Sequence, residues 1–181
     1  MSEFILDNQH ISLDTIQLLL KGNDKVVLGD RAIQKIQACR EYLDQRVSNG
    51  DELIYGINTG FGSLCNTAIS KGDLAKLQQN LVRSHACGTG KLVPEELVKS
   101  MLLLKAIGLS LGHSGAQVET VKRLLYFYNN NIIPVVYQQG SLGASGDLAP
   151  LAHIALTLFG EGEVYVDGTK KQTSEVFAEL K

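Results

Sequence analysis

Hydrophobic residues recur every three or four positions along most of this chain, a spacing typical of helices that bury one face. Short extended stretches separate these patterns, at residues 4–6, at residues 132–137 and in a hairpin that turns at Asp167-Gly168. The pattern therefore predicts one mainly α domain with small β pairs. The helices are expected to begin at or near Ser12, Asp30, Leu74, Pro94, Gln117, Asp147 and Ser174.

Two of these helices are expected to differ in how much of their surface they bury. Residues 97–111 are apolar on nearly every side, which predicts a central buried helix. Gly108 and Gly112 would permit close packing against a neighbouring helix. The helix capped by Ser12 is expected to have a single apolar face, formed by Leu13, Ile16, Leu19 and Leu20.

The helix that begins at Leu74 ends in a histidine. His85 follows three leucines at intervals of three and four residues, so all four side chains share one helical face. The leucines are Leu74, Leu77 and Leu81. A histidine in such a position is more often a core residue with satisfied hydrogen bonds than a functional group.

Small residues are concentrated in residues 140–147, where Ala144, Ser145 and Gly146 come directly before Asp147. Asp147 is suited to cap the next helix, whose first turn offers free N–H groups and the positive end of its dipole. A nucleophile elbow does not fit, because it requires glycine where Asp147 stands. A phosphate-binding loop does not fit either, because no lysine follows the glycines. A loop that merely caps a buried helix is the structural alternative.

A second glycine-rich loop, residues 53–62, has three glycines within seven residues. Tyr55 stands at its entrance, after a short apolar pair. Tyrosine is a useful general base only where its surroundings stabilise the phenolate. The alternative is a core tyrosine with a hydrogen-bonded hydroxyl.

The composition is that of an ordinary globular domain, with 181 residues, 44% hydrophobic and 20% charged residues, and a formal net charge of −2. Such a balance gives no electrostatic reason to expect nucleic acid as a partner. No apolar run approaches the roughly 18 residues of a membrane span. The first residues lack the basic and apolar regions of a secretory signal.

Cysteines and histidines are scattered along the chain. Cys39, Cys65 and Cys87 are odd in number and widely spaced, which argues against a disulfide framework and fits a reducing cytoplasm. The histidines have no metal-binding spacing, so no metal is expected. They are His10, His85, His113 and His153.

Two motifs resemble those of one enzyme family. Residues 140–153 (Gly-Ser-Leu-Gly-Ala-Ser-Gly-Asp-Leu-Ala-Pro-Leu-Ala-His) are similar to the signature of the aromatic amino acid ammonia-lyases. Residues 55–62 (Tyr-Gly-Ile-Asn-Thr-Gly-Phe-Gly) resemble the tyrosine loop of the same family. In that family the Ala-Ser-Gly triplet becomes a methylidene-imidazolone (MIO) group. The resemblance therefore implies that Ala144, Ser145 and Gly146 cyclise autocatalytically, with no external cofactor.

The resemblance also implies roles for three side chains. Tyr55 would be the base that removes the β-proton of the substrate. Ser84-His85 resembles the selectivity pair of the histidine lyases, whereas Phe-Leu is typical of phenylalanine lyases and His-Leu of tyrosine lyases. The implied reaction is elimination of ammonia from L-histidine to give trans-urocanate, the first step of histidine degradation. His85 would help to bind the imidazole or carry protons.

The resemblance runs from about residue 4 to the end and covers the N-terminal portion of the family's longer chains. Those chains continue into a long helical bundle of fumarase/aspartase-like architecture and form homotetramers with shared active sites. We therefore expect residues 1–181 to be an MIO-loop domain cut short before that bundle. The isolated chain is expected to lack appreciable lyase activity, because groups that position the substrate are missing.

Two other hypotheses remain open at this point. One keeps the MIO group but changes the substrate or reaction, giving a tyrosine or phenylalanine lyase or an aminomutase. The other is a non-catalytic module that only folds or associates, because its long apolar helix would expose a surface once the bundle is absent.

Overall fold

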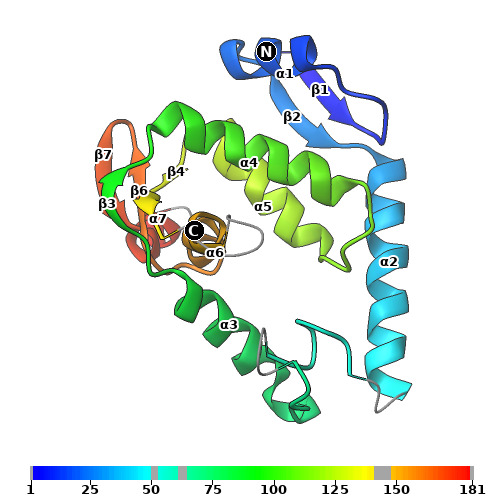
Figure 1. Cartoon of the computed structure of the whole chain (residues 1–181). Helices are drawn as coiled ribbons and strands as arrows, with labels where there is room; N and C mark the ends of the chain where they lie inside the picture. The colour runs from blue at the N-terminus through cyan, green and yellow to red at the C-terminus, as the bar shows by residue number, and fades with distance from the viewer. Residues whose placement is uncertain (1, 50–52, 61–64, 141–147, 180–181) are drawn as a thin grey trace.

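The computed structural model describes residues 2–49, 53–60, 65–140 and 148–179, and most of these are helical (Figure 1). Two helices, α4 (Glu95–Ser110) and α5 (Val118–Asn129), lie side by side at its centre. Their facing surfaces supply much of the hydrophobic core, including Leu102, Leu124 and Phe127. The predicted mainly α fold with small β pairs is confirmed.

The N-terminal unit is a strand–helix–strand crossover at one end of the molecule. Ser12 caps its helix as predicted, because its Oγ accepts a hydrogen bond from the backbone N–H of Thr15 at 3.1 Å. The prediction for Leu13 is wrong: its side chain is 79% exposed, and the helix buries Leu19 instead. The two strands pair in parallel. The elements are β1 (Glu3–Leu6), α1 (Leu13–Lys21) and β2 (Lys25–Leu28).

The long helix α2 (Asp30–Asn49) starts where it was predicted to start, but Asp30 is its first helical residue. A distant carboxylate binds the first turn, since Oδ1 of Asp7 accepts a hydrogen bond from the N–H of Ala32 at 3.0 Å. Asp7 follows β1, so this bond ties the N-terminal unit to α2.

Helix α4 buries one face and exposes the other, so the prediction of burial on nearly every side is wrong. Leu97 and Leu104 are 53% and 50% exposed, and Leu111, which directly follows the helix, is 41% exposed. Among the described residues, α5, α2 and β4 pack against α4 and leave these leucines exposed. The buried residues on that face are Val98, Leu102, Leu103, Ala106 and Ser110.

The turn between α4 and α5 packs closely on α2 at one of the two predicted glycines. Gly112 has a φ of +74°, and a Cβ there would lie 2.7 Å from the backbone carbon of Lys35. Gly108 faces open space, because a Cβ there would meet no atom within 4 Å. The close approach is therefore confirmed at Gly112 and wrong at Gly108.

The C-terminal part forms a small antiparallel sheet followed by a helix. Its hairpin turns at Asp167-Gly168 as predicted, with φ angles of 50° and 72° at those residues. The last helix begins at Thr173, so Ser174 lies inside the first turn and does not precede it. The elements are β4 (Ile133–Pro134), β6 (Glu163–Val166), β7 (Thr169–Gln172) and α7 (Thr173–Glu179).

The remaining elements position the predicted site residues. The helix α3 (Leu74–His85), entered through a short 3-10 turn, η2 (Lys71–Asp73), packs against α6 (Leu148–Leu158). Directly after α3, β3 (Thr89–Leu92) pairs antiparallel with β5 (Tyr137–Gln139). The chain that leaves α3 is thereby held beside the chain that leads toward residues 141–147.

Candidate active site

The C-terminal end of α3 carries the predicted selectivity pair. Nδ1 of His85 lies 2.7 Å from the carbonyl oxygen of Leu81, one helical turn earlier. A carbonyl oxygen only accepts, so this contact assigns the proton of a neutral imidazole to Nδ1 and makes Nε2 an acceptor. The Ser84 hydroxyl donates to the same carbonyl at 2.9 Å and lies 3.1 Å from Nδ1 of His85. His85 is half-buried and thus lies at the edge of the core.

The tyrosine loop is attached to the same helix. Nε2 of Gln78 donates hydrogen bonds to the carbonyl oxygens of Gly56 and Ile57, at 2.9 and 3.0 Å. Gln78 precedes His85 by seven residues, or two helical turns, so both side chains lie on one face of α3. One face of α3 therefore carries two of the predicted site components.

Tyr55 lies in the turn that Gln78 holds, and its side chain is 62% exposed. The alternative of a core tyrosine is therefore wrong for this chain. Around it the loop is well bonded: Oδ1 of Asn58 accepts the N–H of Ile54 at 2.7 Å, and Thr59 is fully buried. The backbone of this turn is fixed, whereas the ring of Tyr55 is accessible.

The two described segments that border residues 141–147 lie against each other. A Cβ on Gly140, whose φ is +125°, would lie 3.2 Å from Cβ of Ala149 in the first turn of α6. The same Cβ would lie 2.9 Å from Cα of Gly88, which follows α3. Two glycines thus allow the chain after α3, the end of β5 and the start of α6 to meet.

His153 of α6 binds this crossing. Its Nε2 accepts a hydrogen bond from the backbone N–H of Gly88 at 3.0 Å. Its ring packs at an angle on Tyr137, with the centroids 5.3 Å apart. Burial lowers the pKa of His153, which favours the neutral ring that this hydrogen bond requires.

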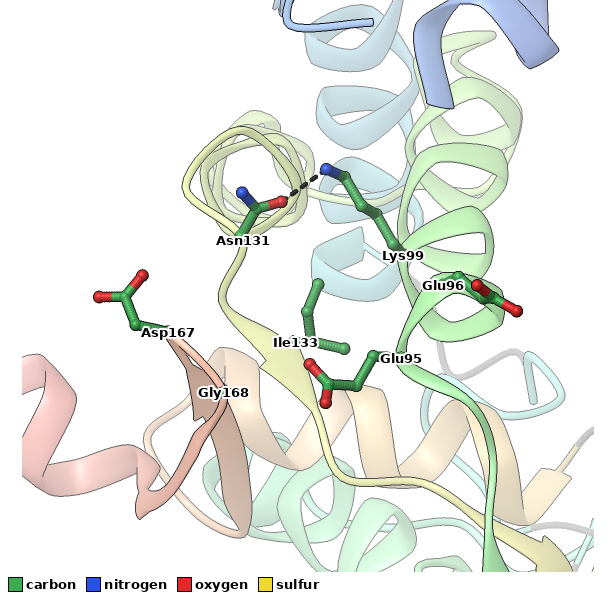
Figure 2. Close-up of a pocket in the computed structure, with 7 residues that line it drawn as sticks. All are labelled: Glu95, Glu96, Lys99, Asn131, Ile133, Asp167 and Gly168. Atoms are coloured by element: carbon green, nitrogen blue, oxygen red, sulfur yellow. Dashed lines mark hydrogen bonds between the residues drawn. The ribbon is translucent and has the colours of Figure 1, made fainter. Parts of the chain in front are cut away.

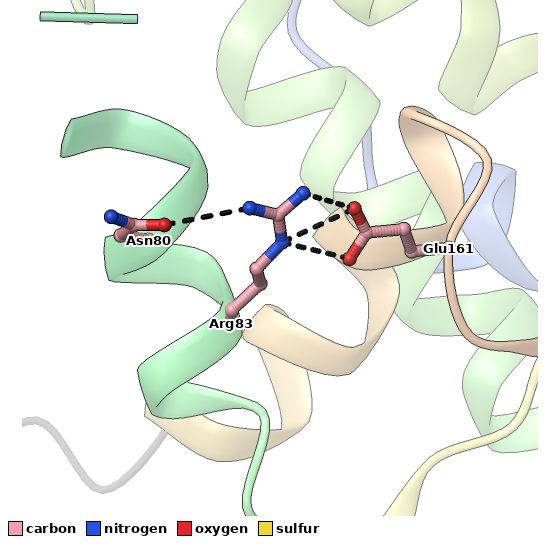
Figure 3. A network of polar contacts seen from close by, with 3 residues as sticks. All are labelled: Asn80, Arg83 and Glu161. Atoms are coloured by element: carbon pink, nitrogen blue, oxygen red, sulfur yellow. Dashed lines mark hydrogen bonds and ion pairs between the residues drawn. The ribbon is translucent and has the colours of Figure 1, made fainter. Parts of the chain in front are cut away.

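A surface ion pair also connects α3 to the segment after α6. Figure 3 shows the guanidinium of Arg83 facing the carboxylate of Glu161, with Nε at 3.1 and 3.0 Å from the two carboxylate oxygens. Nη1 of Arg83 also donates to Oδ1 of Asn80 at 3.4 Å. The hydrogen bond from Arg83 lowers the pKa of Glu161. Both side chains are exposed, so the pair adds little stability on its own.

The structure brings only part of the predicted site together. Tyr55, Ser84 and His85 are described and lie on or beside α3. The expectations for Ala144, Ser145 and Gly146, and for the Asp147 cap, fall outside the described residues. The sequence interpretation missed Gln78, Arg83 and His153. For His153 a signal existed, because it ends the motif of residues 140–153; Gln78 is marked only by its two-turn spacing from His85.

A surface cavity of about 250 Å³ lies elsewhere, between the start of α4 and the β6–β7 hairpin (Figure 2). In it, Nζ of Lys99 donates to Oδ1 of Asn131 at 2.5 Å and lies over the ring of Tyr128. Burial lowers the pKa of Lys99. The lining contains none of the predicted site residues: it consists of Glu95, Glu96, Lys99, Asn131, Ile133, Asp167 and Gly168.

Within the described ranges, no three His, Cys, Asp or Glu side chains are grouped so that they could hold a metal ion. The three cysteines are free thiols. No described helix has the length and apolar character needed to cross a bilayer.

Comparison with known proteins assigns the family. Residues 11–181 match the aromatic amino acid lyase family, and the chain belongs to that family. It is 47% identical over 176 residues to a histidine ammonia-lyase of Deinococcus radiodurans, an alignment that covers 97% of this chain and 33% of the relative. The chain therefore spans about a third of the length of the curated relatives it matches.

Solved structures give the same fold. The crystal structure of histidine ammonia-lyase from Trypanosoma cruzi superposes with a TM-score of 0.83 at 33% identity, covering 99% of this chain and 34% of that one. A tyrosine aminomutase from Streptomyces globisporus superposes with a TM-score of 0.86 at 32% identity, covering 98% of this chain and 33% of that one. The same fold is thus found in an ammonia-lyase and in an aminomutase, whose names give different substrates.

Proposed function

We propose that this chain is the N-terminal, MIO-forming domain of a histidine ammonia-lyase, which eliminates ammonia from L-histidine to give trans-urocanate. The observation that carries the proposal is the arrangement along α3. One face of this helix holds the Tyr55 loop through Gln78 and carries His85 two turns later. The chain that follows is bound to both segments that border residues 141–147.

The proposed prosthetic group would form from Ala144, Ser145 and Gly146. The amide nitrogen of Gly146 would bond to the carbonyl carbon of Ala144, with loss of that carbonyl oxygen and of the Ser145 hydroxyl as two waters. The described flanks fit such a closure, because Gly140 and Ala149 lie in contact and bring the two ends of the segment together. The finished group would supply an electrophile that no unmodified side chain provides.

The proposed work of Tyr55 is to take the β-proton of the substrate. A base must reach the proton that it removes, and the 62% exposure of the Tyr55 ring leaves it accessible on a fixed turn. Gln78 would keep the Tyr55 ring in its orientation, since it binds the carbonyl groups of Gly56 and Ile57, the two residues after Tyr55.

The proposed work of Ser84 and His85 is to recognise the imidazole of L-histidine. Nδ1 of His85 lies 2.7 Å from the carbonyl oxygen of Leu81 and 3.1 Å from the Ser84 hydroxyl, so the two side chains form a polar pair. A polar pair suits a substrate imidazole better than a phenyl ring, because a buried imidazole needs hydrogen-bond partners. The 47% identity with a histidine ammonia-lyase supports this substrate over an aromatic carbocycle.

We further propose that the whole enzyme is a cytoplasmic homotetramer and that residues 1–181 form one domain of it. The exposed leucines of α4 support a larger assembly, because they form an apolar surface on a helix that is otherwise in the core. In isolation the 181-residue chain is proposed to be inactive, since it spans about a third of the length of its relatives and lacks the rest of their chain.

A tyrosine-specific aminomutase is the second candidate, supported by the superposition on the Streptomyces globisporus enzyme. It predicts the same electrophile but a different substrate. Ser84-His85 favours histidine, so competition between substrates distinguishes the two candidates.

The test is a chimera in which this chain replaces the matching third of the Deinococcus radiodurans enzyme. Intact mass and peptide mapping would report a deficit of two waters at residues 144–146. Ultraviolet absorbance would report urocanate from L-histidine, with L-tyrosine and L-phenylalanine as competing substrates. The unaltered relative, prepared in parallel, is the positive control for folding and rate.

We expect the two-water deficit and turnover of L-histidine in preference to the other two amino acids. A folded chimera with the unmodified mass would overturn the electrophile. A modified chimera that prefers L-tyrosine would overturn the substrate and favour the aminomutase.

A further inference from the structure

Three segments that are distant in sequence meet at the backbone of Gly88. A Cβ on this residue would lie 2.9 Å from Nε2 of His153, 3.1 Å from Cβ of Tyr137 and 3.2 Å from the carbonyl oxygen of Gln139. Tyr137 and Gln139 belong to β5, and His153 belongs to α6. Only glycine fits this slot without moving a neighbour.

The slot contains one specific polar contact. The N–H of Gly88 donates to Nε2 of His153 at 3.0 Å across 65 residues of sequence. The His153 ring is supported from the side by Tyr137. Without an acceptor at this point, a part-buried amide would be left unpaired, which destabilises this arrangement.

This contact lies three residues beyond His85. The nearby alternative tie between α3 and α6, Arg83 with Glu161, is exposed on both sides and screened by solvent. The hydrogen bond to His153 is part-buried and directed, so it sets the position of the turn after α3 more firmly than the ion pair does.

We infer that His153 is a positioning residue, whose Nε2 holds the turn after Ser84-His85 against the strand and helix that border residues 141–147. The inference rests on the proposed function for the reaction that it serves. The contact itself belongs to the described chain and can be measured without any activity. His153 does not touch the substrate in this scheme; it fixes the place of residues that do.

The test uses two variants with opposite predictions. His153→Phe keeps an aromatic ring beside Tyr137 but removes the acceptor, whereas His153→Gln keeps an acceptor at similar reach without the ring. His113→Phe, at an exposed position, is the matched control. Glycine-selective nitrogen-15 labelling of the 181-residue chain reports hydrogen exchange at the Gly88 amide. The chimera reports kcat and KM for L-histidine.

In His153→Phe we expect faster exchange at Gly88 and a fall in kcat/KM of roughly 100-fold, because a displacement of about 1 Å has that effect on a positioned site. His153→Gln should restore slow exchange and most of the rate, and His113→Phe should match the parent. Unchanged Gly88 exchange in a folded His153→Phe chain would overturn the inference. The inference would also be overturned if His153→Gln restored slow exchange at Gly88 but did not recover the rate.

The two proposals can fail separately. A parent chimera that does not turn over L-histidine refutes the proposed function and leaves the exchange result at Gly88 to decide the contact. An active parent with an equally active His153→Phe variant refutes the positioning role alone.

Discussion

At the scale of single residues, His85 is the side chain on which the proposed specificity depends. Replacing it by leucine in the chimera should lower kcat/KM for L-histidine by roughly 10- to 100-fold, because an unpaired buried polar group costs about 1–3 kcal/mol. Steady-state kinetics with L-histidine would measure the loss. His113→Leu, the same change at an exposed position, should leave the rate intact. Undiminished histidine turnover in His85→Leu would show that the substrate does not contact this residue.

The neutral state of His153 makes the stability of the chain depend on pH. Burial lowers its pKa below the ordinary value of 6.5, so the folded chain binds this proton less readily than the unfolded chain. The contribution is complete above pH 6.5 and falls as the pH drops from 6.5 toward the lowered value. The ring faces the Gly88 amide after α3 and the Tyr137 ring of β5, neither of which is charged at these pH values.

Urea unfolding of the parent chain and of His153→Gln, between about pH 5.5 and about pH 7.5, would test this dependence. The unfolding free energy of the parent, relative to that of His153→Gln, should fall as the pH falls. A difference that stays constant across this range would contradict the assignment, because the remaining titratable groups are common to both proteins.

At the scale of elements, the turn between α4 and α5 fixes these helices against α2. Gly112→Ala should lower the free energy of unfolding by about 1 kcal/mol or more, because φ is +74° and the new Cβ would meet the backbone of Lys35 at 2.7 Å. Gly108→Ala is the matched control in open space within the α4 helix, where alanine should stabilise by roughly 1 kcal/mol. Thermal unfolding of both variants would show whether each substitution lowers or raises the stability. Equal shifts in the same direction would contradict this packing.

At the scale of the whole molecule, the exposed stripe of α4 should cause the isolated chain to self-associate. Leu97, Leu104 and Leu111 recur every seven residues on this face, so a second apolar surface can cover them together. Leu104→Glu should shift the chain toward monomer in light scattering over a concentration series. Leu13→Glu introduces the same charge at a 79% exposed leucine of α1 and should leave the association unchanged. A parent chain that is monomeric throughout would refute the prediction.

Contacts between neighbouring residues could be predicted from the sequence, whereas contacts between distant segments could not. The Ser12 cap and the Asp167-Gly168 turn depend on neighbours within a few residues, and both were predicted correctly. The contacts of Asp7 with α2 and of His153 with Gly88 join segments 25 and 65 residues apart. No local pattern encodes such pairs, because which surfaces meet depends on how every intervening element packs.

The sequence by itself determined the periodicity of the helices, the Ser12 cap and the motifs that carry the family resemblance, since each is a property of adjacent residues. The tertiary structure alone decided that α4 exposes one apolar face and that Tyr55 is accessible. It also decided that Gln78 binds the tyrosine loop and that His153 holds the turn after His85. These outcomes depend on burial and on directed hydrogen bonds between distant segments, which exist only once the chain has folded.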